Sequence, residues 1–146
     1  MKFLHTMIRI RDINESLHFY CTLLGLKEVR RTENKKGRFT LIFLAAPDQI
    51  DMATTEKSPL LELTYNWDPE HYQSGRNFGH IAFLVDHIYD ICTFLQKQNI
   101  TIHRPPRDGR MAFIKSPDHI SIELLQKGEP LPLKEPWVSM KSSGDW

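Results

Sequence analysis

The sequence lacks most features that mark specialised classes of protein. Only two of its 146 residues are cysteine, and neither belongs to a Cys-x-x-Cys motif, which disfavours a disulfide framework and a thiolate metal site. A formal charge of +1 offers no electrostatic footprint for nucleic acid or membrane. The first eleven residues include Lys2 and Arg9 and contain no apolar core of a signal peptide. We therefore expect a cytoplasmic globular protein with two buried, reduced thiols and with neither nucleic-acid nor membrane partners.

What the sequence does contain is an internal repeat. When His5 is placed over His80, His5–Ile10 overlies His80–Val85, and the apolar positions downstream also correspond. Each copy begins with a strand that starts at the histidine, followed by a polar turn and an amphipathic helix. The first helix is expected to end at Gly25 and the second near residues 98–99. Two copies of one unit imply a pseudo-two-fold fold.

Further strands are predicted after each helix. The segments are 26–31, 39–45 and 60–65 in the first copy and 100–104, 111–115 and 120–125 in the second. The predicted fold class is α+β, with two tandem βαβββ modules. The modules are residues 1–66 and 78–126, joined by a linker of residues 67–77 and followed by a Pro-rich tail of residues 127–146. Trp137 and Trp146 are expected to anchor this tail on the surface.

Strand periodicity places the two histidines on equivalent faces. Successive residues of a strand point to opposite sides of the sheet, so His5 shares a face with Met7 and Arg9, while the other face of that strand is mostly apolar. By the same rule His80 lies opposite the apolar residues of its own strand. The two apolar faces are suited to packing beneath the helices, which leaves both histidines on the open side.

Each copy also carries a carboxylate in the middle of its last strand. Glu62 and Glu123 have Leu or Ile on both sides, and a carboxylate there is costly to desolvate unless it is paired or metal-bound. Taken singly, each glutamate is more typical of a solvated sheet face, and each histidine of a core or edge position. Because all four agree under one repeat operation, they predict a His₂Glu₂ site for a borderline divalent ion such as Ni²⁺, Co²⁺, Zn²⁺ or Mn²⁺.

Four segments carry a family resemblance: FLHTMIRIRDINESLHFY, LLELTYNW, FGHIAFLV and SIELL. Over about residues 1–126 the sequence resembles glyoxalase I (lactoylglutathione lyase), of the vicinal oxygen chelate superfamily. The resemblance implies the same four metal ligands: His5, Glu62, His80 and Glu123. It further implies that glutathione is bound by Arg9, Asn66, Arg76 and Arg110, and that the protein is a homodimer with sites shared between chains.

The resemblance also implies a reaction, methylglyoxal detoxification. The hemithioacetal of methylglyoxal and glutathione would be isomerised to S-lactoylglutathione by a proton shuttle through an enediolate. We assign the shuttle to Glu123, with Glu62 as the alternative because the site is nearly symmetric. One divalent ion per site is implied, with Ni²⁺ or Co²⁺ favoured because the chain is short, as in the bacterial class, and Zn²⁺ possible.

Two segments depart from the family pattern. The usual DPDG turn before the last strand is here Ser116-Pro117-Asp118-His119, and the loop of residues 104–110 is shortened and has Arg where the family often has Lys. These changes bear on the thiol co-substrate more than on the metal.

Two other functions are compatible with the sequence. An epimerase acting next to a thioester would use similar proton chemistry, and a metal-free small-molecule binding or resistance protein would share the fold without needing the His₂Glu₂ set. A ring-cleaving dioxygenase is disfavoured, because its iron site takes two histidines and only one carboxylate.

Overall fold

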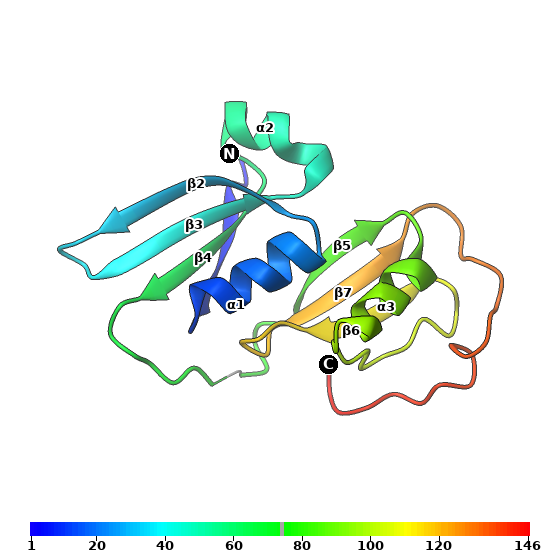
Figure 1. The fold of residues 1–146 in the computed structure, drawn as a ribbon. Coiled ribbons are helices and arrows are strands. Elements are labelled where there is room, and N and C mark those ends of the chain that lie inside the picture. The colour runs from blue at the N-terminus through cyan, green and yellow to red at the C-terminus, as the bar shows by residue number, and fades with distance from the viewer. Residues whose placement is uncertain (74) are drawn as a thin grey trace. The chain divides into compact units, whose positions relative to one another are not determined.

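The computed structural model describes residues 1–73 and 75–146. It divides the chain into two compact units, Met1–Gln73 and Ser74–Trp146 (Figure 1). The boundary falls within the segment 67–77. Each unit has its own sheet with helices packed on it, so the predicted α+β fold of two modules is confirmed.

The first unit contains a four-stranded sheet in the order β1-β4-β3-β2. Its strands are β1 (His5–Ile10), β2 (Lys27–Asn34), β3 (Phe39–Ala45) and β4 (Leu60–Asn66). The pair β1 and β4 is parallel, whereas β2, β3 and β4 pair antiparallel. The three strand segments predicted after the first helix are therefore all present.

The first helix begins after Asp12, whose carboxylate accepts a hydrogen bond from the Glu15 backbone amide at 2.8 Å. Helix α1 (Ile13–Leu17) continues directly into a π-helical segment, η1 (His18–Leu23). The chain then turns at Gly25, whose φ of +82° lies in the left-handed region. The predicted end of this helix is confirmed, while its π-helical second half was not predicted.

Helix α2 (Ile50–Glu56) was also not predicted. It follows a short 3₁₀ turn, η2 (Pro47–Gln49), with Pro47 in the first turn. Proline suits this position, because the first backbone N–H of a helix has no partner within the helix. The buried side chain of Ala53 packs with those of Phe43, Ala45 and Leu60. The helix is thus an insertion between β3 and β4 that closes one end of the sheet.

The second unit has a three-stranded sheet in the order β5-β7-β6. Its elements are β5 (His80–Val85), α3 (Ile88–Lys97), β6 (Met111–Lys115) and β7 (Ser121–Gln126). The strand predicted at residues 100–104 is wrong, because only an isolated bridge between Arg104 and Phe113 forms there. Pro105 and Pro106 follow at once, and proline cannot donate to a ladder and restricts the residue before it.

Helix α3 ends where the sequence predicts, near residues 98–99. The ring of His87 caps its N-terminus by accepting a hydrogen bond from the Asp90 amide at 3.3 Å, and Asn99, with φ of +62°, follows its C-terminus. Cys92 is buried on the inner side of the helix, and burial raises the pKa of its thiol to about 12. Cys21 is only half-buried, so the prediction of two buried thiols is wrong for Cys21.

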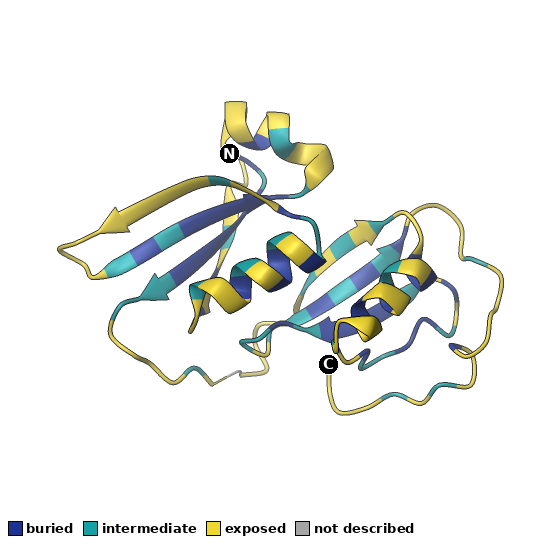
Figure 2. Cartoon of the chain, viewed as in Figure 1, coloured by how far each residue is buried: buried dark blue, intermediate teal, exposed yellow. Residues whose placement is uncertain are grey.

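Burial follows the predicted alternation in β1, β5 and β7, whereas Leu60–Thr64 of β4 are buried on both faces. Ile8 and Ile10 are buried in β1, as are Ile122 and Leu124 in β7, and the intervening residues are more exposed (Figure 2). The helices cover these apolar faces: α3 packs on β6 and β7, and the inward sides of α1 and α3 are buried in Figure 2. The histidines and the mid-strand glutamates are therefore left on the faces away from α1 and α3, and in the first unit α2 packs at one end of that face, against Phe43 and Leu60.

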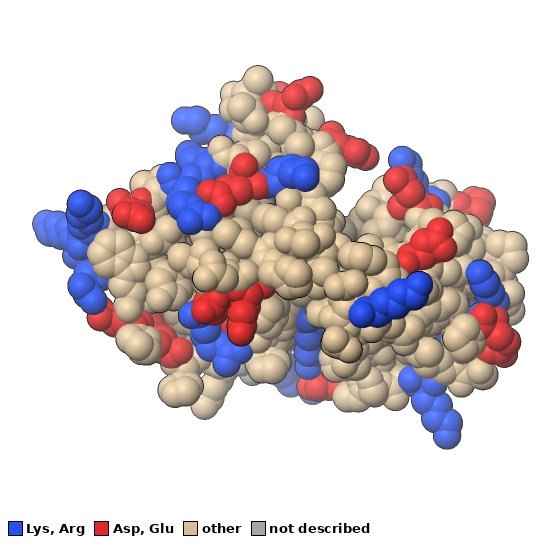
Figure 3. Space-filling view, viewed as in Figure 1, with Lys and Arg blue, Asp and Glu red and all other residues tan. Residues whose placement is uncertain are grey.

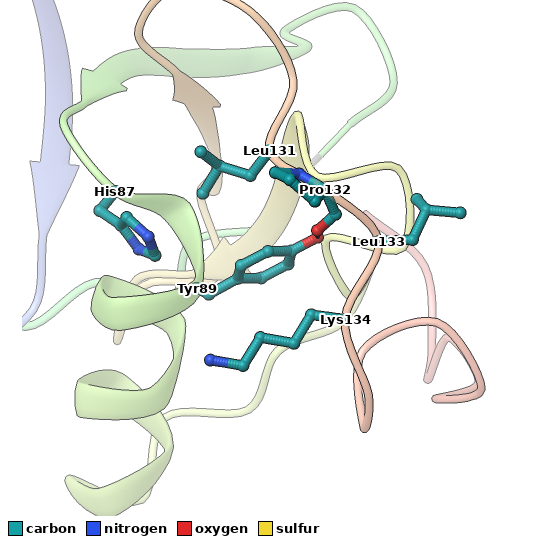
Figure 4. Close-up of a pocket in the computed structure, with 6 residues that line it drawn as sticks. All are labelled: His87, Tyr89, Leu131, Pro132, Leu133 and Lys134. Carbon is teal, nitrogen blue, oxygen red and sulfur yellow. The ribbon is translucent and has the colours of Figure 1, made fainter.

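The tail of residues 127–146 packs on the second unit. The Leu131 amide donates to the Gly109 carbonyl at 3.0 Å, and a Cβ on Gly109 would lie 2.1 Å from the Leu131 oxygen. The Tyr89 hydroxyl donates to the Pro132 carbonyl at 3.0 Å, and Trp137 stacks on the Tyr89 ring. Between the start of α3 and residues 131–134 of the tail lies a pocket of about 290 Å³ (Figure 4). Its lining residues are His87, Tyr89, Leu131, Pro132, Leu133 and Lys134.

The molecular surface carries mixed charge. Over the face seen in Figure 3, acidic and basic side chains are interspersed and separated by uncharged surface. Across the described residues, no helix has the length and apolar character needed to cross a membrane.

The altered turn before β7 is closed by two hydrogen bonds of Ser116. The Ser116 hydroxyl oxygen accepts from the Ile120 amide at 3.2 Å, and the His119 amide donates to the Ser116 carbonyl at 2.9 Å. His119 has φ of +63°, a conformation that favours the glycine found in the family's DPDG turn. Ser116 thus closes the turn through its hydroxyl and carbonyl oxygens, and the exposed His119 occupies a strained position.

His119→Gly should stabilise the protein by about 0.5–1 kcal/mol, because relief of the left-handed strain exceeds the extra unfolded-state entropy of glycine. Urea unfolding of the two proteins measures this difference. Ser116→Ala serves as the contrast, since losing the hydroxyl acceptor should cost about 1 kcal/mol. A less stable His119→Gly protein would contradict the assignment of strain.

Candidate metal centre

The first pair of predicted ligands lies on neighbouring parallel strands. His5 is opposite Leu60 in the register of β1 and β4, so Glu62 is one pleat further along the same face. The His5 Nε2 and Glu62 Oε2 atoms are 3.0 Å apart. The Thr64 hydroxyl donates to the other carboxylate oxygen at 3.3 Å. The parallel register therefore converts two positions distant in sequence into one donor pair.

The second pair repeats this geometry. His80 is opposite Ser121 in the parallel register of β5 and β7, and Glu123 again lies one pleat along. The His80 Nε2 and Glu123 Oε2 atoms are 3.2 Å apart. Side-chain exposures also match, at 37% and 11% for His5 and Glu62 and at 43% and 13% for His80 and Glu123. In both units a largely covered carboxylate meets an imidazole that is still open to solvent.

A phenylalanine ring supports each histidine. Phe43 lies opposite Glu62 on β3, and Phe113 lies opposite Glu123 on β6. Their rings meet the imidazoles edge to face, with centroids 5.9 Å apart for His5 and 5.3 Å for His80. The sequence indicated neither ring, because only the strand register shows which aromatic residue lies beside each glutamate.

The first pair has a further neighbour that the sequence did not indicate. The guanidinium carbon of Arg30 lies 3.8 Å from the centroid of the Phe43 ring, within the range of a cation–π contact. Arg30 is paired with Phe43 in the register of β2 and β3. A positive charge therefore lies one ring away from the His5 imidazole.

The donor atoms of each pair fit a divalent ion. Imidazole nitrogen and carboxylate oxygen are donors that suit such an ion, and in each pair the two donor atoms lie only 3.0 and 3.2 Å apart. In the part of the chain that the structure describes, no three His, Cys, Asp or Glu side chains form a metal-binding group. Each unit thus supplies half of the predicted His₂Glu₂ donor set.

Two of the residues assigned to glutathione lie in the first unit. Arg9 is exposed on β1, on the same face as His5. Asn66 ends β4 on the face of Glu62, and its amide donates to the Glu70 carboxylate at 2.9 Å. Both therefore lie on the face that carries the first donor pair.

The other two assigned residues belong to the second unit. Arg76 is exposed and precedes β5. Arg110 is exposed and precedes β6, where its carbonyl accepts from the Gln126 amide at 2.8 Å. Since His80 is opposite Ser121 at the other end of the sheet, the structure does not place Arg110 beside His80.

The loop before β6 is held together by Asp108. Burial alone would raise the pKa of this carboxyl, but hydrogen bonds from Arg104 and from the Arg110 and Met111 amides lower it below its usual value. Arg104 donates to Asp108 at 2.8 Å and also to the Met111 carbonyl. Arg104 is therefore a structural residue of the loop, whereas the Arg110 side chain is exposed.

Fold and site together define a class of protein: two tandem α+β modules, each of which presents one imidazole and one carboxylate on the open face of its sheet. The chain belongs to the Glyoxalase/Bleomycin resistance protein/Dioxygenase superfamily, whose pattern matches residues 2–124. The tail beyond residue 124 lies outside this match.

Individual relatives agree with this membership. The lactoylglutathione lyase of Neisseria meningitidis serogroup A is 41% identical over 132 residues, which cover 87% of this chain and 91% of the relative. A probable lactoylglutathione lyase of Synechocystis is 37% identical over 131 residues, covering 86% and 95%. The structure of the trypanothione-dependent glyoxalase I of Leishmania major superposes with a TM-score of 0.77 at 35% identity, covering 86% of each chain.

Proposed function

We propose that this protein is a lactoylglutathione lyase, which isomerises the hemithioacetal of methylglyoxal and glutathione to S-lactoylglutathione. The names of the Neisseria and Synechocystis relatives support this activity. The observation that carries the proposal is the pair of equivalent His–Glu contacts, His5 with Glu62 and His80 with Glu123. A metal-free binding protein would not need two such pairs, and no relative named above is an epimerase.

A complete metal site requires both donor pairs. Four nitrogen and oxygen donors suit a borderline divalent ion, and one pair alone offers only two. We propose a homodimer in which His5 and Glu62 of one chain complete the site with His80 and Glu123 of the other, since closed two-fold symmetry gives two such sites. Ni²⁺ or Co²⁺ is the favoured ion, and Zn²⁺ would also suit these donors.

The difficult step of the reaction is removal of a proton from carbon. When bound, a divalent ion would supply positive charge beside the substrate oxygens as negative charge develops. Glu123 takes the proton from the first carbon and returns it to the next, with Glu62 as the alternative base. Both carboxylates are largely covered, which limits exchange of the abstracted proton with water.

The glutathione part of the substrate carries two carboxylates, and the proposed arginines offer complementary charge. Arg9 lies on the face of the first donor pair, and guanidinium groups bind carboxylates through two parallel hydrogen bonds. Asn66, Arg76 and Arg110 are the other proposed contacts. Because the Leishmania relative is described as trypanothione-dependent, assays of both the glutathione and the trypanothione adducts identify the thiol that this chain uses.

The purified dimer should contain about one divalent ion per chain, and His5→Ala and His80→Ala should each lower that content sharply. The two losses should be similar, because each variant removes one ligand of the same four. Elemental analysis after dialysis measures the content, with the exposed His18→Ala as the matched control. Metal loss in only one of the two variants would show that the ion is held by a single pair.

Glu123→Gln should lower kcat about 10²–10⁴-fold, since the amide keeps an oxygen but cannot carry a proton. Arg9→Ala should act mainly on KM, because its contact is remote from the reacting carbons. Steady-state kinetics on metal-loaded proteins separate the two effects. Near-normal turnover in Glu123→Gln, combined with loss in Glu62→Gln, would reverse the assignment of the base.

Mixing two inactive variants tests whether sites are shared. His5→Ala and Glu123→Gln chains, refolded together in equal amounts, should recover about a quarter of wild-type activity. Half of the dimers are then mixed, and one of the two sites in each mixed dimer has both intact halves. Each variant refolded alone is the control. An absence of recovery would place both halves of the site in the same chain.

A further inference from the structure

The tail of residues 127–146 follows the family-matched segment, yet it is held firmly along its length. Beyond its contacts with Gly109 and Tyr89, Arg107 donates to the Met140 carbonyl and to the Ser142 hydroxyl, both at 3.0 Å. The Ser143 amide donates to the His103 carbonyl at 2.8 Å, and the His103 ring contacts the Ser143 carbonyl at 2.8 Å. These hydrogen bonds hold the tail against the loop that precedes β6.

The end of the tail reaches the face of the sheet that carries Glu123. The Lys115 ammonium group lies 3.0 Å from the Asp145 carboxylate, and this hydrogen bond lowers the pKa of Asp145. Lys115 and Phe113 alternate in β6 with Ala112 and Ile114, which are fully buried. Lys115 and Phe113 therefore point to the open face, and Asp145 is attached there.

Trp146 lies next to the aromatic ring that supports His80. The Trp146 and Phe113 centroids are 6.3 Å apart with their planes tilted by 34°, within the range of favourable aromatic pairs. The same Phe113 ring meets the His80 imidazole at 5.3 Å. Trp146 is 45% exposed, so part of its indole surface is still open to a ligand at this half of the site.

In the first unit, whose residues 1–73 are all described, the supporting ring has a different neighbour. There the corresponding ring, Phe43, is covered by the guanidinium of Arg30 at 3.8 Å. The two halves therefore share the donor pair and the supporting ring but differ in what lies over the ring: a charge in one and an indole in the other. An apolar group of the substrate would gain more from the indole.

We propose that Trp146 is a specificity-determining residue that contacts the substituent on the carbonyl end of the substrate and favours a large aromatic substituent over a methyl group. This inference rests on the proposed lyase function. The Lys115–Asp145 contact and the bonds to Arg107 and His103 fix the position of Trp146 before substrate binds. Binding then costs little ordering of the tail.

The test compares two hemithioacetals of glutathione, formed from phenylglyoxal and from methylglyoxal. In Trp146→Ala the ratio of kcat/KM for the phenyl over the methyl substrate should fall about two- to tenfold, the range expected for one lost aromatic contact. Trp146→Phe should retain most of the ratio. Leu133→Ala, another exposed apolar residue of the tail, is the matched control and should not change it. An unchanged or increased ratio in Trp146→Ala overturns the proposal.

Binding measurements separate this inference from the proposed activity. Isothermal titration of metal-loaded protein with S-benzylglutathione and S-methylglutathione should show that Trp146→Ala weakens only the benzyl compound, by a similar factor. If wild-type protein turns over neither hemithioacetal, the lyase function fails, and the titration still decides the role of Trp146. Equal weakening of both compounds, or binding of neither by wild-type protein, overturns that role.

Discussion

The need to pair two largely buried carboxylates, Glu62 and Glu123, determines how the strands of each unit are arranged. Glu62 and Glu123 stand in the middle of strands whose neighbouring side chains are buried, and a carboxylate in such a position needs a partner. In both units the partner is an imidazole on the adjacent parallel strand. A parallel pair cannot be joined by a tight hairpin and needs a long crossover. Bringing the donors together thus requires the helix that leaves each histidine strand and covers the other face.

The two units meet this constraint with different additions. In the first, the sheet is extended by β2 and closed at one end by α2. In the second, the strand equivalent to β2 is reduced to a single bridge at Arg104, which leaves β6 as an edge strand of a three-stranded sheet. The backbone of His103 and Arg104 bonds to Phe113 along this edge, which limits pairing with another strand, and the tail contacts the same loop through His103 and Arg107. Both additions lie around the donor pairs without altering their geometry.

The proposed chemistry follows from dividing the donor set into equal halves. Neither pair alone satisfies a divalent ion, so metal binding in the proposed dimer also stabilises the association of the two chains, because a ligand that binds only the assembled state favours that state. Because the two donor pairs are nearly symmetric, the surroundings of each half decide whether Glu62 or Glu123 acts as the base. The surroundings differ: Thr64 donates to Glu62, Arg30 covers Phe43, and Trp146 borders Phe113.

The sequence by itself determined the repeat, the α+β class, the helix ends at Gly25 and Asn99, and the face on which each histidine and glutamate lies. These features depend on periodicity and on local backbone preference, which short stretches of chain carry on their own. Only the tertiary structure decided that His5 meets Glu62 and His80 meets Glu123, and that Phe43 and Phe113 support them. It also reduced the predicted strand at residues 100–104 to one bridge and brought Trp146 to Phe113. Such contacts depend on the register between strands and segments far apart in the chain, and that register is set by packing and by the hydrogen bonds left to satisfy.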